Sequence, residues 1–173
     1  MENRFDIALS FAMEDYELVN TVYHYLKSEG LRVFFAPSPL GQSLLSGQNQ
    51  REVFCRIFGL NTTYVALFVS KNYISKAVPM EEARIAIAKH SDTATVIPIY
   101  LDDAVLPPEL LDPKQVNYFK SSNPAQISNL LASRVNPQSG HAPSPHGDSS
   151  MHISGNSGEK QVFIQTLHGD INL

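Results

Sequence analysis

The sequence predicts an α/β domain built on an open, mainly parallel β-sheet of about five strands, with helices on both faces. Short β-branched runs alternate with amphipathic segments from residue 5 to residue 134, which calls for parallel strands joined by right-handed crossovers. Residues 64–70 (YVALFVS) are almost wholly apolar, as in a strand buried on both faces. The 173 residues are 43% hydrophobic, enough for one domain with a core and some excess length.

The first half of the chain supplies two strands and one long helix. Residues 5–12 (FDIALSFA) alternate and favour a strand, and residues 16–28 carry apolar side chains at helical spacing. Gly30 suits the end of that helix. Residues 31–35 are predicted as the second strand. Residues 36–47 are rich in proline, glycine and serine, so we expect a long loop at the same sheet edge.

The middle of the chain contains the segment around which the fold is arranged. Residues 50–58 have helical spacing, and residues 64–70 are the predicted third strand. The following helix bears Glu82, and Pro79 suits its first turn. Glu82 is therefore expected in a first helical turn, close to the carboxyl end of a central strand.

The last part of the domain completes the alternation. Residues 95–101 (TVIPIYL) are the predicted fourth strand, and Pro98 points to an edge or a bulge. Residues 102–113 are acidic and proline-rich, residues 116–119 are expected as a short fifth strand, and residues 124–134 as the last helix. The predicted domain covers residues 1–135.

Composition narrows the classes of function. The net charge of −4 and the lack of a basic face argue against a nucleic-acid partner. The single cysteine, Cys55, excludes an internal disulfide and a cysteine metal cluster, and its apolar surroundings suggest a buried structural thiol. No metal site is expected. Without a signal peptide or a membrane-spanning run, we expect a cytoplasmic protein with no membrane contact.

Two segments follow the predicted domain. Residues 136–160 are rich in Ser, Gly, Pro and His, and such a composition predicts a flexible linker. Residues 161–173 (QVFIQTLHGDINL) are β-prone and lack lysine, arginine and proline, as steric-zipper segments do. The tail resembles bacterial amyloid-type signalling motifs, which template on a matching motif in a sensor protein. Two other interpretations explain the pattern equally well: a strand that docks on an exposed edge of the domain's own sheet, or an apolar segment with no specific role.

Glu82 is the leading candidate for chemistry, because ligands of open α/β sheets bind at the carboxyl ends of the strands. The alternative is a solvated carboxylate near the positive end of a helix. Other sites of this fold class do not fit. The turn after the first strand, residues 10–15 (SFAMED), lacks the glycines of a dinucleotide fold. The third strand ends in Val69-Ser70-Lys71, which leaves too few oxygen ligands for a receiver-type magnesium ion.

Three stretches together resemble a Toll/interleukin-1 receptor (TIR) domain of the kind found in bacterial immune proteins. They are residues 5–12 with Glu14-Asp15 behind them, residues 30–35 leading into the long loop, and Ser70-x-x-Tyr73-x-x-Lys76 followed by Glu82. The resemblance covers about residues 4–134 and implies a flavodoxin-like open sheet. The family often has a tryptophan at the position held here by Val78.

The resemblance implies a function in immune signalling and defence. In enzymatic members of the family the glutamate cleaves NAD at the nicotinamide–ribose bond, so NAD is expected as substrate and no cofactor is needed. The leaving nicotinamide is cationic in the substrate and departs neutral, so one carboxylate suffices to stabilise the ribosyl centre. Pocket residues are expected in two places, residues 11–14 and the loop at residues 45–47. The substrate-binding set is Phe11, Ala12, Met13, Glu14, Ser46, Tyr73 and Lys76.

A non-enzymatic adaptor is the competing interpretation, since many members of the family only bind other TIR domains. Both interpretations predict self-association through TIR domains. In the catalytic one, stacked tails bring the domains together and complete the active site. The possible second partner is a sensor protein whose β motif matches residues 161–173.

Overall fold

The computed structural model describes residues 4–90, 94–112 and 116–137. The predicted tail at residues 161–173 and the predicted linker beyond residue 137 lie outside the described residues.

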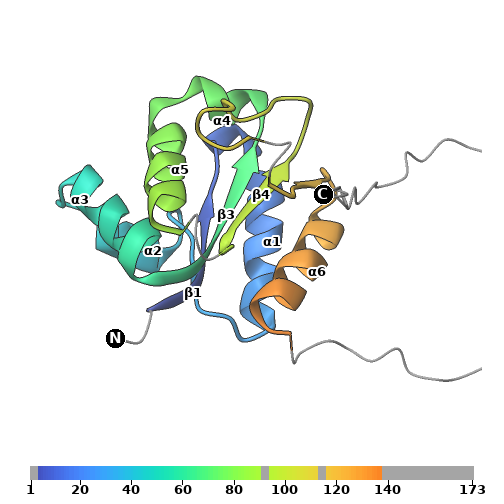
Figure 1. The fold of residues 1–173 in the computed structure, drawn as a ribbon. Coiled ribbons are helices and arrows are strands. Elements are labelled where there is room, and N and C mark those ends of the chain that lie inside the picture. Colours follow the sequence, from blue (N-terminus) through green and yellow to red (C-terminus); the bar gives the residue numbers. More distant parts are fainter. Residues whose placement is uncertain (1–3, 91–93, 113–115, 138–173) are drawn as a thin grey trace, which may run out of the picture.

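A five-stranded parallel sheet forms the centre of the molecule (Figure 1). Its strands are β1 (Phe5–Ser10), β2 (Val33–Phe34), β3 (Thr62–Val69), β4 (Val96–Tyr100) and β5 (Phe119–Lys120). The order β2-β1-β3-β4-β5 and the parallel pairing throughout confirm the predicted fold class. The carboxyl ends of β1 and β3 are neighbours, with Ser10 opposite Leu67, and that edge carries the site.

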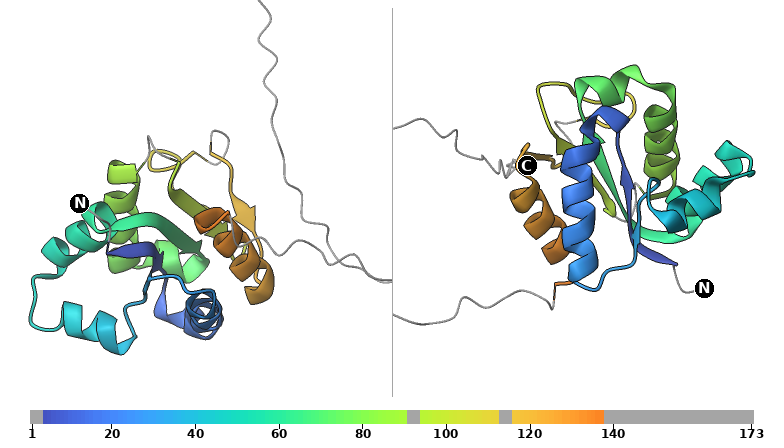
Figure 2. Two further views of the ribbon diagram at one scale, coloured as in Figure 1. Left: turned by 90° about the horizontal axis from the view of Figure 1, so that it is seen from below. Right: turned by 180° about the vertical axis from the view of Figure 1, so that it is seen from behind.

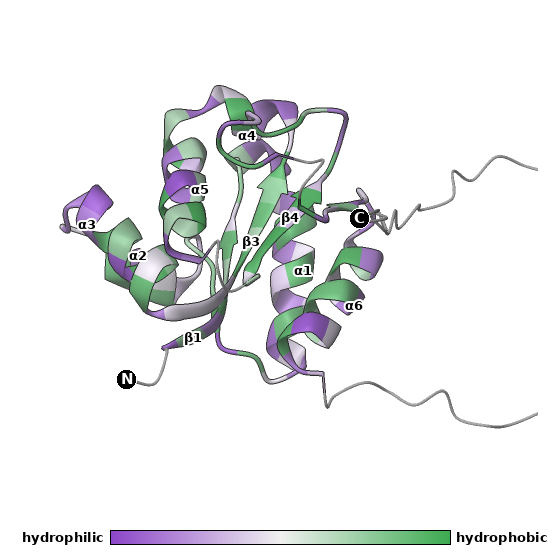
Figure 3. Ribbon diagram, in the orientation of Figure 1, coloured by the Kyte–Doolittle hydropathy of each residue, from purple (hydrophilic) through white to green (hydrophobic). Residues whose placement is uncertain are grey.

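Helices cover both faces of the sheet (Figure 2). On one face lie α1 (Tyr16–Ser28) and α6 (Pro124–Val135), whose buried residues share a core with alternate residues of the strands. On the other face lie α5 (Ala77–His90) and the segment formed by α3 (Gln50–Phe54) and η2 (Cys55–Leu60). Figure 3 shows that β3 and β4 are hydrophobic between these layers, as expected of strands covered on both faces.

Local sequence explains the helix ends. Gly30 follows α1 with a φ of 81°, a left-handed conformation that costs glycine little. Asn123 caps α6, its side chain accepting from the backbone N–H groups of Ala125 and Gln126, and Pro124 stands at the start of the helix.

The predicted loop at residues 36–47 contains a helix, α2 (Pro39–Leu45), so that part of the prediction was wrong. Ser38 caps it by accepting from the Gly41 N–H at 3.0 Å, and Pro39 begins it. A proline and a serine next to each other predict a loop by composition, but here they form a helix start.

The helix that bears Glu82 also differs from the prediction. It begins at Ala77 rather than near Pro79, so Glu82 lies beyond its first turn. A short helix not predicted from the sequence, α4 (Lys71–Ser75), precedes it and is capped by Ser70. This extra helix lies between β3 and α5 and carries Tyr73.

Smaller departures concern strands and the cysteine. The second strand is shorter than residues 31–35, and the fifth is shifted from residues 116–119 to Phe119–Lys120. Pro98 lies on β4, an interior strand rather than an edge, opposite Leu67 of β3; β5 pairs with β4 only beyond it. Cys55 is half-buried rather than buried. Among the described residues, no helix is both long and apolar enough to cross a membrane.

Candidate functional site

A cavity of about 430 Å³ opens at the carboxyl end of β1, between the turn after β1, the α2–α3 region and the start of α5. Its lining is mostly apolar and includes one carboxyl and one ammonium group, those of Glu82 and Lys76. The remaining lining residues are Leu9, Phe11, Ala12, Met13, Ala36, Leu45, Gln50, Phe54, Ala77, Val78 and Pro79. The size and composition are those of small-molecule sites.

Glu82 lies at the inner wall of this cavity and is only 8% exposed. The Ser10 hydroxyl, at the end of β1, donates to its Oε2 over 2.6 Å. The Tyr73 hydroxyl lies 2.7 Å from the same Ser10 oxygen. Ser10 and Tyr73 are both completely buried, so the carboxyl group is supported from behind by two hydroxyl groups that water does not reach.

Burial raises the pKa of the Glu82 carboxyl from 4.5 to about 8, and the Ser10 hydrogen bond lowers it only in part. At pH 7 the carboxyl group is therefore mostly protonated. A carboxyl group that titrates close to neutral pH inside a cavity is typical of catalytic acids and bases.

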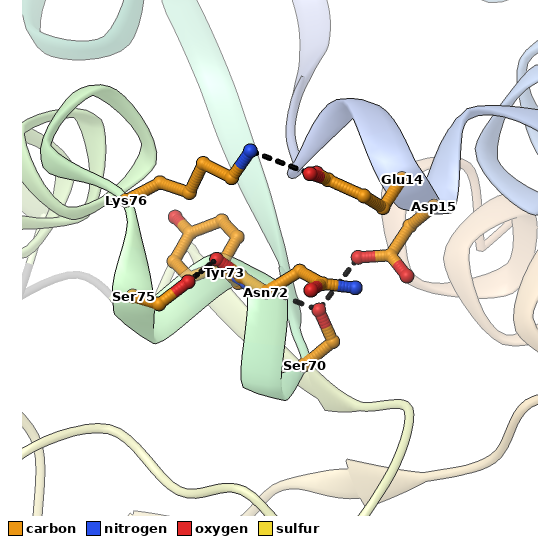
Figure 4. A network of polar contacts seen from close by, with 7 residues as sticks. All are labelled: Glu14, Asp15, Ser70, Asn72, Tyr73, Ser75 and Lys76. Carbon is orange, nitrogen blue, oxygen red and sulfur yellow. Dashed lines mark hydrogen bonds and ion pairs between the residues drawn. The ribbon is translucent and has the colours of Figure 1, made fainter.

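A second set of polar contacts joins the turn after β1 to the end of β3 (Figure 4). The Ser70 hydroxyl donates to Asp15 Oδ2 at 2.6 Å and accepts from the Tyr73 N–H at 3.1 Å. Asp102 accepts from the Lys71 N–H at 3.0 Å. Burial raises the pKa of Asp15, although its bond with Ser70 acts in the opposite direction. These contacts fix α4, and with it Tyr73, against two neighbouring strand ends.

Lys76 follows α4 and forms an ion pair with Glu14 of η1 (Met13–Asp15), as Figure 4 shows. The hydrogen bond from Lys76 lowers the pKa of Glu14. Lys76 lines the cavity, whereas Glu14 does not. Both side chains are a little under half exposed, so an anionic part of a ligand at the cavity can compete with Glu14 for the ammonium group.

The structure brings together five of the eight predicted site residues. Phe11, Ala12, Met13, Lys76 and Glu82 line the cavity. Glu14 lies outside it against Lys76, and exposed Ser46 turns back to the Gln42 carbonyl. Tyr73 is buried behind Glu82. The geometry therefore gives Tyr73 a supporting position rather than a place in the cavity lining.

Sequence reasoning missed Ser10. The signal was present, because Ala8, Ser10 and Ala12 alternate on one face of the first strand, and that face meets α5. A lone hydroxyl among small apolar residues at the end of a buried strand indicates a polar partner. The partner itself comes from a distant part of the chain.

A larger but shallower hollow, of about 620 Å³, lies along α3 beside Arg51, Cys55 and Arg56. Its charged side chains are exposed, and it lies away from the strand ends that bind ligands in this class of sheet. Within the described ranges no cluster of three or more His, Cys, Asp or Glu side chains can hold a metal ion. The cavity at Glu82 is therefore the better candidate.

The fold and the cavity define a TIR-type α/β domain. Residues 7–131 match the TIR domain family, and the chain belongs to that family. Two solved structures share the fold: the TIR domain of the Toll-related receptor TRR-2 from Hydra magnipapillata, and the TIR domains of the activated Roq1 resistosome, which recognises the effector XopQ. The first has a TM-score of 0.58 at 17% identity over 73% of this chain and 95% of that one. The second has a TM-score of 0.50 at 21% identity over 78% and 75%.

One curated relative is a 3′ cyclic ADP-D-ribose synthase, AaTIR of Aquimarina amphilecti. It is 30% identical over an alignment of 142 residues, which covers 78% of this chain. The aligned part is 42% of the relative's length, so the relative contains a large portion that this chain does not match.

Proposed function

We propose that this chain cleaves NAD⁺ at the bond between nicotinamide and ribose, with Glu82 as the catalytic carboxylate. The single observation that carries the proposal is the buried Glu82 carboxyl group at the wall of a cavity at the strand ends. The NAD-derived product in the name of the 30% identical relative supports the choice of substrate.

The reaction needs little protein chemistry. The C–N bond breaks, and its electron pair moves to the ring nitrogen, so that nicotinamide leaves as a neutral molecule. The ionised Glu82 stabilises the positive charge that develops on the ribosyl carbon. Water then attacks that carbon and releases a proton, which gives ADP-ribose. Attack by a hydroxyl group or ring nitrogen of the same nucleotide gives a cyclic product instead.

The substrate itself favours the reactive form of the carboxyl group. Burial within the protein raises the pKa of Glu82 to about 8. A cationic nicotinamide ring beside the carboxyl group favours its ionised form. In this arrangement Phe11 and Met13 form apolar walls, and Lys76 at the mouth faces the diphosphate.

Mixing the full chain with NAD⁺ and identifying the products by mass spectrometry tests the proposal. We expect free nicotinamide with either ADP-ribose or a cyclic isomer, and loss of turnover in Glu82→Gln. The matched control is Glu81→Gln, because Glu81 is the adjacent residue but pairs with Arg51 and Arg84 outside the cavity. Turnover that persists in Glu82→Gln contradicts the assignment.

The alternative function is a non-catalytic TIR adaptor. The observation that favours it is Val78, which lines the cavity at the position where the family often has a tryptophan, so an aromatic ring for stacking a substrate is missing there. An adaptor shows no nicotinamide release from NAD⁺ at any pH between 6 and 9, whether the protein is dilute or clustered on a multivalent support.

Self-association in immune signalling is the second part of the proposal. TIR domains meet through their folded parts, and residues 161–173 add a β-type contact with other copies or with a sensor that carries a matching motif. A synthetic peptide of residues 161–173 tests the tail by thioflavin fluorescence. A peptide that stays soluble and unstructured at high concentration contradicts templating by the tail.

A further inference from the structure

We propose that Ser10 and Tyr73 are positioning residues, which hold the Glu82 carboxylate through a buried chain of hydrogen bonds and keep its second oxygen free for the ligand. The Ser10 hydroxyl is 2.6 Å from Glu82 Oε2 and 2.7 Å from the Tyr73 hydroxyl. Only the effect on reaction rate rests on the proposed NAD cleavage; the chain itself is a property of the folded domain.

The direction of the chain follows from counting protons. A serine hydroxyl has one proton, and Ser10 donates it to Glu82 Oε2. The contact between Ser10 and Tyr73 then requires Tyr73 to be the donor. Burial raises the pKa of Tyr73 well above its ordinary value, so Tyr73 keeps the proton that it donates.

This direction suits the ionised form of Glu82. A neutral carboxyl group that carries its proton on Oε1 still accepts from Ser10 at Oε2, but a hydroxyl donates a stronger hydrogen bond to a carboxylate than to a neutral carbonyl. Protonation of Oε2 itself would turn the Ser10 proton toward Tyr73 and leave the Tyr73 proton without its acceptor, and since Ser10 and Tyr73 are 0% exposed, water does not replace that acceptor. The hydrogen-bond chain therefore favours the carboxylate against the effect of burial.

Each member of the chain is held by a different element. Ser10 ends β1 and is paired with Leu67 of β3. Tyr73 is part of α4, whose start is capped by Ser70. Glu82 comes from α5, within the same apolar core that holds Tyr73. With Oε2 bonded to Ser10, Oε1 is the oxygen that remains for a ligand in the cavity.

Other titratable groups around α5 have partners of their own. Lys76 pairs with Glu14, and Glu81 pairs with Arg51 and Arg84. His90 contacts the Phe58 carbonyl. Tyr100 of β4 differs, because its ring packs in the same core cluster as Tyr73 while its buried hydroxyl makes no hydrogen bond within the described residues. None of these contacts includes Ser10, so a Ser10 variant changes the hydrogen-bond chain without breaking an ion pair.

The test measures the titration of Glu82 directly, by NMR of the full chain with ¹³C-labelled glutamate side chains, and assigns the signal with Glu82→Gln. Loss of a hydrogen bond to a charged group moves a titration midpoint by about one pH unit or more. We expect Ser10→Ala to raise the Glu82 midpoint by that amount, and Tyr73→Phe to raise it by less. The matched control is Ser128→Ala, which removes a hydroxyl equally buried on α6 and leaves the midpoint unchanged.

The rate with NAD⁺ provides the second readout. At pH 7 the Ser10→Ala variant is expected to lose about tenfold in kcat/KM, because the ionised fraction falls tenfold per pH unit. The deficit narrows as the pH approaches 10, which a merely structural defect would not do. A midpoint that stays at the wild-type value in both Ser10→Ala and Tyr73→Phe overturns the proposal. Wild-type protein that cleaves no NAD⁺ overturns the proposed function instead. The titration of Glu82 then still shows whether Ser10 and Tyr73 stabilise its carboxylate.

Discussion

The Ser10 hydroxyl donates a 2.6 Å hydrogen bond to Glu82 across a sequence separation of 72 residues. This contact joins the end of β1 to α5, the long helix on the face of the sheet that α1 does not cover. It places a carboxyl group at the wall of the cavity. Both residues are buried, so the pKa of Glu82 depends on the packing of the whole fold around it.

The first prediction concerns the pH dependence of NAD⁺ cleavage. Because burial raises the pKa of Glu82 to about 8, kcat/KM should rise with pH and level off above pH 8. The cationic substrate favours the ionised carboxylate, so kcat should level off at a lower pH. Initial rates at limiting and at saturating NAD⁺, from pH 5.5 to 9.5, measure both curves. Glu82→Gln corrects for uncatalysed decay. Flat profiles contradict a catalytic role for this carboxylate.

The second prediction concerns stability. Between pH 4.5 and about 8 the folded protein keeps the Glu82 proton, whereas the unfolded chain has released it. Glu82 therefore makes the free energy of unfolding fall by about 1.4 kcal/mol for each pH unit in that window, with no further fall above pH 8. The free energy of unfolding of Glu82→Gln lacks this pH dependence, so it should rise relative to that of the wild type as the pH rises. Urea unfolding from pH 5 to 9 measures the difference.

The control for the stability prediction is Glu81→Gln. Glu81 is adjacent in sequence but pairs with Arg51 and Arg84 near the surface, where ion pairs change stability little. Its unfolding free energy should follow that of the wild type across the pH range. A wild-type curve parallel to that of Glu82→Gln would mean that Glu82 titrates normally in the folded protein.

The third prediction concerns Lys76. Lys76 lines the cavity mouth, so Lys76→Gln should raise KM for NAD⁺ by about fivefold or more, through loss of a charged contact to the diphosphate, and leave kcat nearly unchanged. The melting temperature should change little, because the ion pair with Glu14 is exposed. Steady-state kinetics with NAD⁺ and with nicotinamide riboside, which has no diphosphate, separate the effects.

Lys71→Gln is the matched control for Lys76. Lys71 is an exposed lysine on α4 that does not line the cavity, so its KM should equal that of the wild type. An equal rise of KM for NAD⁺ and for nicotinamide riboside in Lys76→Gln would contradict a diphosphate contact.

The fourth prediction concerns the helix in the predicted loop. A Cβ on Gly41 would lie 2.3 Å from the Phe35 carbonyl oxygen and 2.6 Å from that of Ala36, so the backbone must shift. Gly41→Ala should destabilise the protein by about 2–3 kcal/mol. Gly47→Ala is the comparison, since Gly47 has a φ of 71° and open space around it. Backbone strain alone should lower the free energy of unfolding of this variant by about 1 kcal/mol. Urea unfolding ranks the two variants, and an equal loss contradicts the close approach.

Local patterns predicted much of the fold. The apolar run of the third strand, the helical spacing at residues 16–28 and the glycine after it depend on near neighbours in the chain, and the structure agrees with each. The errors arose where composition and geometry disagree. The segment around Pro39 has the composition of a loop but is a capped helix, and α4 is too short to show a period.

The site was predicted only in part for a related reason. Three features depend only on the spacing of side chains along the polypeptide, and the sequence was enough to predict them: strand and helix alternate, Glu82 lies beside a central strand end, and an acidic group there is a candidate for chemistry. Only the tertiary structure decided that Ser10 and Tyr73 support the carboxyl group, that Lys76 lines the cavity while Glu14 and Ser46 do not, and that the pKa of Glu82 is raised. Burial and contacts across three elements belong to the packed molecule, because each depends on residues that are distant in sequence and adjacent in space.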